Sequence, residues 1–453
     1  MVLYMYIMKK IFKNIVVNIL SYESRKVLKK YNPKIIAVTG NIGKTTSKDY
    51  IYNFLKFKLR ENVRASEKSQ NSEFGLNLTI LGEKNAWNNP LAWFYIIIKN
   101  LFGLFFTSFY PKTLVLEVGA DKPGDIKFLA RIFSPDIAVL TAFQKSPTHG
   151  EFFLNIDQHI LEKKFLVDAL KDGGTIVYNA DDEVMSQLAQ GKLAESKNTK
   201  IVSFGFGDTS NVRIVSYENI YDQEGQINGI SANFSISLEN NNYKLTLEFL
   251  GVLGVAHLYS IASSICVSLL EGMSITEVEN AVHEFDKENS LSKSRMRILK
   301  GVNNSIIVDD SYNSSPKAAE NAIETIREIK SVGKRIAILG HMAELGDRTK
   351  VEHFNIGFLA SQSFDIIVLS GRYNEYFLEG IRENKFDLSK VFLANNSSEV
   401  IDLISKNNLI GNNDLILVKG SQSARLEKVV INLLRDKEDK SKVCRQDTEW
   451  EKR

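Results

Sequence analysis

The chain has 453 residues, of which 44% are hydrophobic and 25% are charged. These proportions are typical of a soluble globular protein, and the length predicts two or three domains. The formal net charge of +3 is too small to indicate a nucleic-acid partner. The two cysteines, Cys266 and Cys444, lie far apart without the spacing of metal ligands, which excludes a disulfide framework and fits a reducing cytoplasm.

Residues 1–33 are predicted to form a basic amphipathic helical segment. The first twenty residues are apolar with lysines interspersed, and further cations follow as far as Lys30. Such a helix can lie on an anionic membrane surface, and it can equally pack on the first domain, so both interpretations stay open. The stretch has no cleavage site of small residues, and a signal peptide is therefore not expected.

Residues 34–50 predict a phosphate-binding loop. An apolar, β-rich run at 35–38 is followed by the letters TGNIGKTT and then by apolar residues at helical spacing. Glycines let backbone N–H groups approach phosphate oxygens, the lysine reaches the terminal phosphates, and the next threonine holds Mg²⁺. A chance Gly-Lys-Thr in an ordinary turn is the alternative, which the flanking strand and helix disfavour. The predicted nucleotide-binding residues of this loop are Gly40, Asn41, Gly43, Lys44, Thr45 and Thr46.

A strongly apolar stretch at 91–110 approaches the length of a membrane span. Lys99 and Asn100 lie at its centre, where a charge would be costly inside a bilayer. We therefore expect a buried or interfacial helix, inserted in the nucleotide-binding domain, and docking on a membrane surface stays open.

Further strands end in candidate polar ligands. The apolar run at 113–119 carries Glu117 near its end, where a carboxylate at the edge of a nucleotide-binding sheet is placed to bind Mg²⁺. His149 lies in the loop after the next strand, predicted at 136–141. Asn179 ends another strand, and this polar tip can bind ribose or base or cap the following helix.

The first domain is expected to span residues 34–290. Alternating apolar and polar residues within 211–250 predict an antiparallel hairpin appended to a parallel α/β sheet. Two helices are predicted near 256–270 and 274–287, and a polar stretch at 284–293 reads as a linker between domains.

Residues 291–435 predict a second, Rossmann-like α/β domain. Short apolar runs alternate with helical patterns, which favours a parallel sheet wrapped by helices. The predicted strands are 305–308, 335–339, 365–370, 391–394 and 415–418. Residues 436–453 are rich in charge, and a disordered tail is expected there.

Several motifs together point to one family. In chain order they are TGNIGKTT at 39–46, LEVGA at 116–120 with Pro123 and Gly124, His149 with Glu151, NAD at 179–181, DDSYN at 309–313 with Pro316, MAELG at 342–346 and KGS at 419–421. Over roughly residues 34–435 the chain resembles the Mur ligases, ATP-dependent amide-bond ligases of peptidoglycan precursor synthesis. It looks most like the branch that adds D-alanyl-D-alanine to UDP-N-acetylmuramoyl-tripeptide. The short loop, with two residues between its glycines, is the variant that this family uses.

The resemblance implies a three-step chemistry. ATP phosphorylates a substrate carboxylate, an amine attacks the resulting acyl phosphate, and ADP and phosphate leave. It implies that Thr45 and Glu117 hold Mg²⁺ at the ATP phosphates, and that His149 helps to hold a second Mg²⁺ beside a carbamoylated lysine. Lys163 is the best match for that lysine and Lys164 is the second, with an ordinary solvated lysine as the alternative for either.

The resemblance also assigns residues in and near the second domain. It implies that Arg295, Asp310 and Asn313 lie near the nucleotide, and that Lys419 and Ser421 bind the incoming amine or the acyl phosphate. Helix capping or surface ion pairing is the alternative for all five. The family's Gly-x-His-Asn motif is replaced here by Gly254-Val255-Ala256-His257, so that the predicted nucleotide contact falls on His257 in place of asparagine.

The family's separate UDP-binding domain precedes the phosphate loop, whereas only some thirty residues precede it here. We therefore expect UDP recognition to be lost or supplied elsewhere, and a lipid-linked substrate is one hypothesis. Alternatives to the cell-wall ligase are a related ligase acting on folate, a polymer or a lipid-linked carboxylate, and a non-catalytic ATP-binding subunit. We expect a cytoplasmic monomer with small-molecule substrates, no nucleic acid and, at most, peripheral membrane contact.

Overall fold

The computed structural model describes residues 2–66, 72–87, 89–106, 109–143, 153, 155–238, 241–287, 292–446 and 450. His149 and Glu151 lie outside these residues, as does the expected domain boundary at 290. Within the described parts of the chain, no helix is both long enough and apolar enough to cross a membrane.

The first part of the chain is built on a nine-stranded sheet with the order β2-β3-β1-β4-β5-β6-β7-β8-β9. Its parallel strands are β1 (Lys34–Thr39), β2 (Val63–Ala65), β3 (Thr113–Glu117), β4 (Ile137–Leu140), β5 (Thr175–Asn179) and β6 (Lys200–Gly205). β7 (Val212–Tyr221) pairs parallel to β6, and β8 (Ile227–Leu238) and β9 (Asn241–Leu250) continue antiparallel. The predicted hairpin is thus confirmed as the last two strands of a three-stranded meander.

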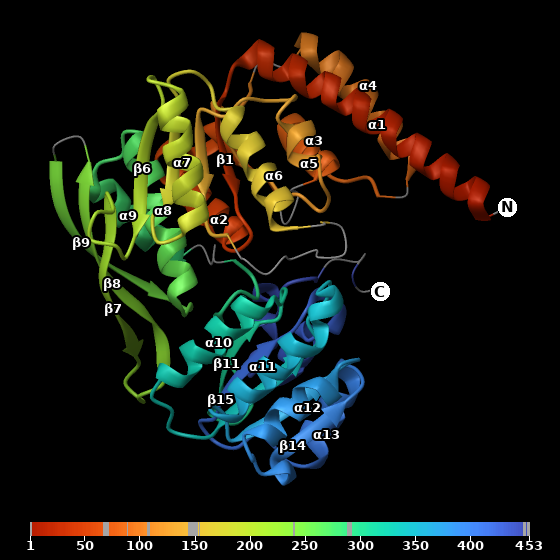
Figure 1. The fold of residues 1–453 in the computed structure, drawn as a ribbon, viewed down its shortest axis with the longest axis vertical. Coiled ribbons are helices and arrows are strands. Elements are labelled where there is room, and N and C mark those ends of the chain that lie inside the picture. Colours follow the sequence, from red (N-terminus) through yellow and green to blue (C-terminus); the bar gives the residue numbers. More distant parts are fainter. Residues whose placement is uncertain are drawn as a thin grey trace.

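Helices cover this sheet and position the loops at its edge (Figure 1). They are α1 (Val2–Tyr31), α2 (Lys44–Leu59), α3 (Glu73–Leu81), α4 (Pro90–Phe106), α5 (Asp125–Leu129), α6 (Ile156–Asp168), α7 (Glu183–Glu195), α8 (Val255–Leu270) and α9 (Ile275–Lys287). α1 packs through Val16, Leu20 and Val27 into the cluster that contains Leu114 and Leu116 of β3. Packing on the first domain, one of the two interpretations of residues 1–33, is therefore observed for the second half of α1.

The second part of the chain has a six-stranded sheet with the order β10-β11-β15-β12-β13-β14. Its strands are β10 (Arg297–Lys300), β11 (Ile306–Asp310), β12 (Arg335–Gly340), β13 (Ile366–Ser370), β14 (Val391–Ala394) and β15 (Leu415–Lys419). The other strands are parallel, as expected for a Rossmann-like sheet, whereas β10 is antiparallel and was not predicted. Its helices are α10 (Pro316–Glu328), α11 (Thr349–Ser361), α12 (Asn374–Glu383), α13 (Ser397–Lys406) and α14 (Glu427–Leu433).

Short 3₁₀ turns complete the chain: η1 (Arg60–Asn62), η2 (Val302–Asn304), η3 (Gly346–Arg348), η4 (Leu388–Lys390), η5 (Gln422–Ala424) and η6 (Lys437–Lys442).

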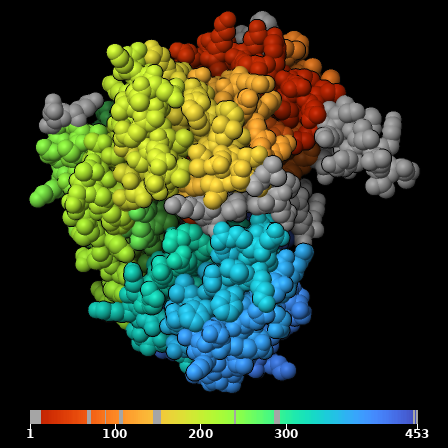
Figure 2. Space-filling model, in the orientation of Figure 1, coloured from red at the N-terminus to blue at the C-terminus, as the bar shows by residue number. Residues whose placement is uncertain are grey.

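The two sheets form an upper and a lower body that meet along one seam (Figures 1 and 2). Strands β7 and β8 reach down to the lower body, where Tyr217 Oη donates to Glu328 at 3.3 Å and Lys300 Nζ pairs with Asp222 at 3.0 Å.

The expectation of a disordered tail from residue 436 is wrong as far as residue 446. After η6, the Cys444 N–H donates to Ser294 Oγ at 3.0 Å, and Arg445 pairs with the buried Glu427 at 3.3 Å. Arg445 adds to the pair that Glu427 already makes with Arg425 at 2.6 Å, and these buried contacts hold the tail against the second body. The number of charged residues in the tail did not indicate these partners.

Candidate active site

The phosphate loop connects β1 to α2 and is shaped by its glycines and by the end of β4. At Gly40 the backbone has φ 150°, and a Cβ would lie 2.1 Å from Thr141 Oγ1, so this position requires glycine. The Asn41 N–H donates to Ala142 O at 2.6 Å, and Thr141 Oγ1 donates to Ile42 O at 2.7 Å. The neighbouring strand therefore holds the loop open at the edge of the sheet.

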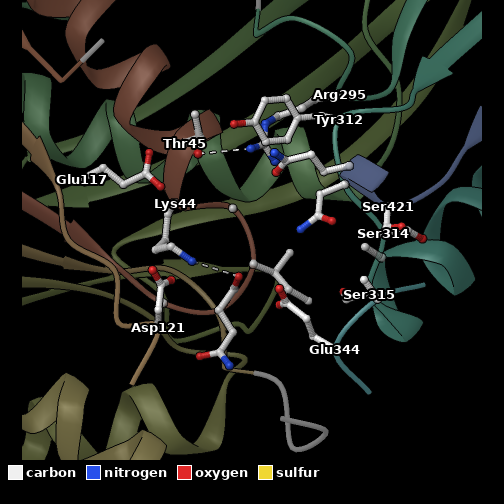
Figure 3. Close-up of a pocket in the computed structure, with 18 of the residues that line it drawn as sticks. Lys44, Thr45, Glu117, Asp121, Arg295, Tyr312, Ser314, Ser315, Glu344 and Ser421 are labelled. Carbon is white, nitrogen blue, oxygen red and sulfur yellow. Dashed lines mark hydrogen bonds between the residues drawn. The ribbon is translucent and has the colours of Figure 1, made fainter. Parts of the chain in front are cut away.

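Lys44 and Thr45 begin α2 inside a cavity of about 700 Å³ that lies between the two bodies. Figure 3 shows Lys44 Nζ donating to the carbonyl of Asn41, at 3.2 Å. Loss of water around Lys44 lowers the pKa of its ammonium group, while the charge of Glu117 acts in the opposite direction. Glu117, at the end of β3 and 1% exposed, lines the same cavity. Thr46 is buried and is not part of the lining.

The structure distinguishes the two candidate lysines of α6. Lys163 is 3% exposed and lines the cavity, and desolvation together with the nearby charge of Lys44 lowers its pKa to about 7. Lys164 points elsewhere, since its Nζ pairs with Asp168 at 2.9 Å. Glu162 accepts from the N–H groups of Gly124 at 2.5 Å and Ile126 at 2.7 Å, which fixes α6 against α5.

One further residue of this wall was missed in the sequence. His159 lies one helical turn before Lys163, is 3% exposed, lines the cavity and stacks on Phe153 with ring centroids 3.7 Å apart. The spacing of four residues between a histidine and a lysine on one helix was the available signal. His149, predicted to hold a metal, lies outside the described residues.

The opposite wall comes from the second body. Arg295 donates from Nη2 to Thr45 Oγ1 at 3.2 Å, and its guanidinium lies 4.2 Å from the centre of the Tyr312 ring (Figure 3). Asn313 and Ser421 line the cavity, and their predicted contacts with the nucleotide and the substrate stay predictions. The rest of this wall consists of Tyr312, Ser314, Ser315, Ala318, Ala343, Glu344, Leu345, Gln422, Ser423, Arg425 and Trp450.

A buried histidine holds the loop that carries Glu344. The Met342 N–H donates to His353 Nε2 at 2.9 Å, and His353 Nδ1 lies 2.6 Å from Thr349 O. Because Nε2 accepts, the proton of the neutral ring is on Nδ1. Burial lowers the pKa of His353 to about 4, so the ring is neutral near pH 7.

Two predicted ligands of the second body form part of its framework instead. Lys419 is 2% exposed, and its Nζ lies 2.5 Å from Asp310 Oδ2 and 3.0 Å from Asn313 O. Neither Lys419 nor Asp310 lines the cavity. The pair holds the loop that presents Asn313, and the substrate contact predicted for Lys419 stays untested.

Two predicted nucleotide ligands of the first body also lie away from the cavity lining. His257 Nδ1 lies 3.1 Å from Tyr50 Oη and its Nε2 lies 2.9 Å from Arg295 O, and burial lowers its pKa to about 4. Asn179 accepts from the N–H of Asp181 at 3.0 Å and so shapes its own turn. Both side chains make hydrogen bonds within the protein, and the motif match did not indicate these contacts.

A second cavity, of about 1210 Å³, adjoins the first. The two share Thr45, Arg295, Tyr312, Gln422 and Trp450, so they meet at the end of the phosphate loop. Aromatic and basic side chains line the second cavity, among them Tyr52, Lys56, Arg64, Phe74, Trp87, Phe109 and Arg445. The two cavities therefore form adjoining spaces at the end of the phosphate loop.

Comparison with known proteins agrees with this arrangement. Residues 38–267 match the Mur ligase middle domain, and residues 294–422 match the Mur ligase, glutamate ligase domain. The chain therefore belongs to the Mur ligase family of ATP-dependent enzymes that form peptide bonds. It is 25% identical over 416 residues to UDP-N-acetylmuramoyl-tripeptide--D-alanyl-D-alanine ligase of Bacillus subtilis (strain 168), covering 91% of this chain and 78% of that protein.

A protein of the same name from Buchnera aphidicola subsp. Acyrthosiphon pisum (strain APS) is 26% identical over 422 residues, with 91% of this chain and 79% of the relative covered. Among solved structures, the MurF ligase from Thermotoga maritima in complex with ADP has a TM-score of 0.70 at 24% identity, covering 94% of this chain and 84% of that one. MurF from Acinetobacter baumannii has a TM-score of 0.69 at 19% identity, covering 93% and 80%. The predicted fold class is thereby confirmed.

Proposed function

We propose that the protein adds D-alanyl-D-alanine to a UDP-N-acetylmuramoyl-tripeptide, with ATP as the energy source and an acyl phosphate as the intermediate. The observation that carries this proposal is the first cavity, where Lys44, Thr45 and Glu117 of the first body and Asn313 and Ser421 of the second body line the same space. The names of the relatives in Bacillus subtilis and Buchnera aphidicola supply the substrates.

The phosphates of ATP would bind on the loop at 40–45. Burial lowers the pKa of Lys44, and a phosphate beside it would raise that pKa, as the charge of Glu117 does. The solved structure of the related Thermotoga maritima ligase is a complex with ADP, which supports nucleotide binding by this protein. Positioning and positive charge are the main requirements of phosphoryl transfer, and Lys44 and Arg295 supply both.

The donor set beside the loop fits Mg²⁺. Thr45 offers a hydroxyl oxygen and Glu117 offers a carboxylate oxygen, which are ligands that this hard cation prefers. When bound, the ion would neutralise charge on the phosphates. We propose that these two residues hold it, with His149 as a candidate for a second ion.

We further propose that Lys163 is carbamoylated. Its pKa of about 7 leaves much of the amine neutral at physiological pH, and only the neutral amine can attack CO₂. The nitrogen forms a bond to carbon, loses one proton and becomes an anionic carbamate. A signal from ¹³C-labelled carbamate that is present in the wild type and in Lys164→Ala, and absent in Lys163→Met, would support this proposal.

The test of the activity is phosphate release from ATP and Mg²⁺ with UDP-N-acetylmuramoyl-tripeptide, with and without D-alanyl-D-alanine. Release that requires both substrates, disappears in Lys44→Ala and persists in Lys164→Ala supports the proposed ligase. Lys164 is the matched control because it lies on the same part of the fold but outside the cavity. ATP binding without release in any combination of these substrates would contradict the proposal.

A further inference from the structure

α4 exposes an apolar face to solvent. Its inner side includes Trp93 and Ile96, which are 6% exposed and pack into the first body. The outer side carries six large apolar residues between 36% and 79% exposed: Leu91, Phe94, Tyr95, Ile98, Leu101 and Phe102. Spacings of three and four residues place them on one face of the helix. An apolar face of this size on a protein surface marks an interaction site.

The segments on either side of α4 contribute aromatic residues to the second cavity. Trp87, before α4, is 49% exposed, and Phe109, after it, is 54% exposed. Both residues also line the second cavity. The two residues that flank α4 in the chain are therefore both exposed and part of the lining of the second cavity.

The charges near this face are positive. No acidic residue occurs in α4, whose cation Lys99 is paired with Glu83 at 2.8 Å and remains half exposed. α1 packs beside α4, and its last turns expose Arg25, Lys26, Lys29 and Lys30. Both helices lie at the end of the molecule opposite the blue C-terminal body (Figures 1 and 2).

We propose that this surface, the outer face of α4 with Trp87 and Phe109, docks on an anionic lipid bilayer with the helix parallel to the membrane plane. Aliphatic and aromatic side chains enter the boundary of the acyl chains, where Trp and Tyr are favoured, while the cations of α1 attract acidic headgroups. A second copy of the chain fits less well, because a two-fold interface uses the same patch on both copies and α4 has no acidic residue to meet the α1 cations. Docking would place the mouth of the second cavity at the bilayer surface.

The test is flotation of the full chain with vesicles. One set contains equal parts of phosphatidylglycerol and phosphatidylcholine, and the other contains phosphatidylcholine alone. We expect binding to the anionic vesicles, and a loss of at least about tenfold in the partition coefficient for Phe94→Ser/Phe102→Ser. The matched control is Val332→Ser/Val351→Ser, which removes two apolar residues that are 65% and 57% exposed on the second body and should leave binding unchanged.

A second variant separates the contribution of charge. Lys26→Glu/Lys29→Glu should weaken binding to anionic vesicles while leaving the residual binding to phosphatidylcholine in place. Thermal unfolding and ADP affinity are measured on every variant, so that misfolding is not read as lost docking.

Three outcomes would overturn the proposal: no flotation of the wild type, equal loss in the control variant, or a wild-type dimer in light scattering that Phe94→Ser/Phe102→Ser converts to a monomer. The last would assign the face to a second copy. Phosphate release with soluble substrates is measured without vesicles, so a failed ligase assay and a failed docking assay remain distinct results.

Discussion

The guanidinium of Arg295 reaches from the start of the second body to the phosphate loop of the first, where its Nη2 donates to Thr45 Oγ1 at 3.2 Å. The same group lies over the ring of Tyr312 at 4.2 Å. One planar cation thus contacts both walls of the cavity. A lysine could supply the charge but not the flat, stacked donor.

Arg295→Lys is therefore expected to reduce kcat/KM for ATP, and to affect the free energy of unfolding less. Loss of the charged hydrogen bond and the stacking should reduce kcat/KM for ATP by roughly 10- to 100-fold, equivalent to about 1.4–2.8 kcal/mol. Steady-state kinetics over a range of ATP concentrations measures this, with Arg213→Lys as control, because Arg213 pairs with Asp208 outside both cavities. An unchanged kcat/KM would show that Arg295 acts only as a structural link.

Lys163→Met is expected to stabilise the protein while removing activity. The folded-state pKa of Lys163 is about 7, below its ordinary value of 10.5, so the unfolded chain binds more protons between these pH values. The contribution of this lysine to the free energy of unfolding therefore increases as the pH rises from about 7 to 10.5. Below pH 7 the lysine destabilises the fold most. Lys163→Met should gain about 1–3 kcal/mol at pH 7 in CO₂-free buffer, and the gain should shrink as the pH approaches 10.5. Denaturant unfolding at several pH values tests this, and a gain independent of pH would contradict it.

His257 is expected to make the fold sensitive to acid. Its folded-state pKa is about 4 against an ordinary value of 6.5, because burial disfavours the charged ring between Tyr50 Oη and Arg295 O. The unfolded state then binds more protons, so the stability contributed by neutral His257 is lost as the pH falls from 6.5 to 4. His257→Asn should flatten this part of the stability profile measured by urea unfolding. His353 also has a pKa of about 4. His353→Asn should therefore remove a similar part of the pH dependence of stability, independently of His257. A profile identical to the wild type in both variants would exclude these histidines as its cause.

Lys419→Met and Ser421→Ala should have different effects although the two residues are neighbours in the sequence. Lys419→Met leaves Asp310 without its buried partner and should lower the free energy of unfolding by roughly 3–5 kcal/mol. Ser421→Ala changes the cavity lining and should raise KM for a substrate with less than about 1 kcal/mol change in stability. Parallel unfolding and kinetic measurements separate the two, and a purely kinetic effect of Lys419→Met would restore it as a substrate ligand.

Local chemistry made the phosphate loop predictable, because its glycines, lysine and threonine act within a few residues of one another. Alternation of strands and helices likewise predicted both sheets. It was harder to predict which residues of α6 face the cavity. Lys163 and Lys164 are neighbours in the sequence, and only the packing of the helix places one of them in the cavity. Burial of the Lys419–Asp310 pair depends on strands distant in sequence, which no local pattern reveals.

The contacts by which β7 and β8 hold the second body have a mechanical consequence. The hydrogen bonds of Tyr217 with Glu328 and of Tyr221 with the N–H of Lys330 are solvent-exposed, and each contributes only about 0.5–1.5 kcal/mol. Stronger contacts stand beside them: Lys300 pairs with Asp222 at 3.0 Å, and Gln226 Nε2 donates to Asn304 O at 2.6 Å. Phe249 of the first body and Ile323 of the second also belong to one buried apolar cluster. The side that carries β7 and β8 therefore anchors the second body to the first, and any change in the angle between the bodies would pivot about this anchor. Ligands that span the cavity would favour the angle at which both walls contact them, so the contact between the bodies should tighten with occupancy and loosen when products leave.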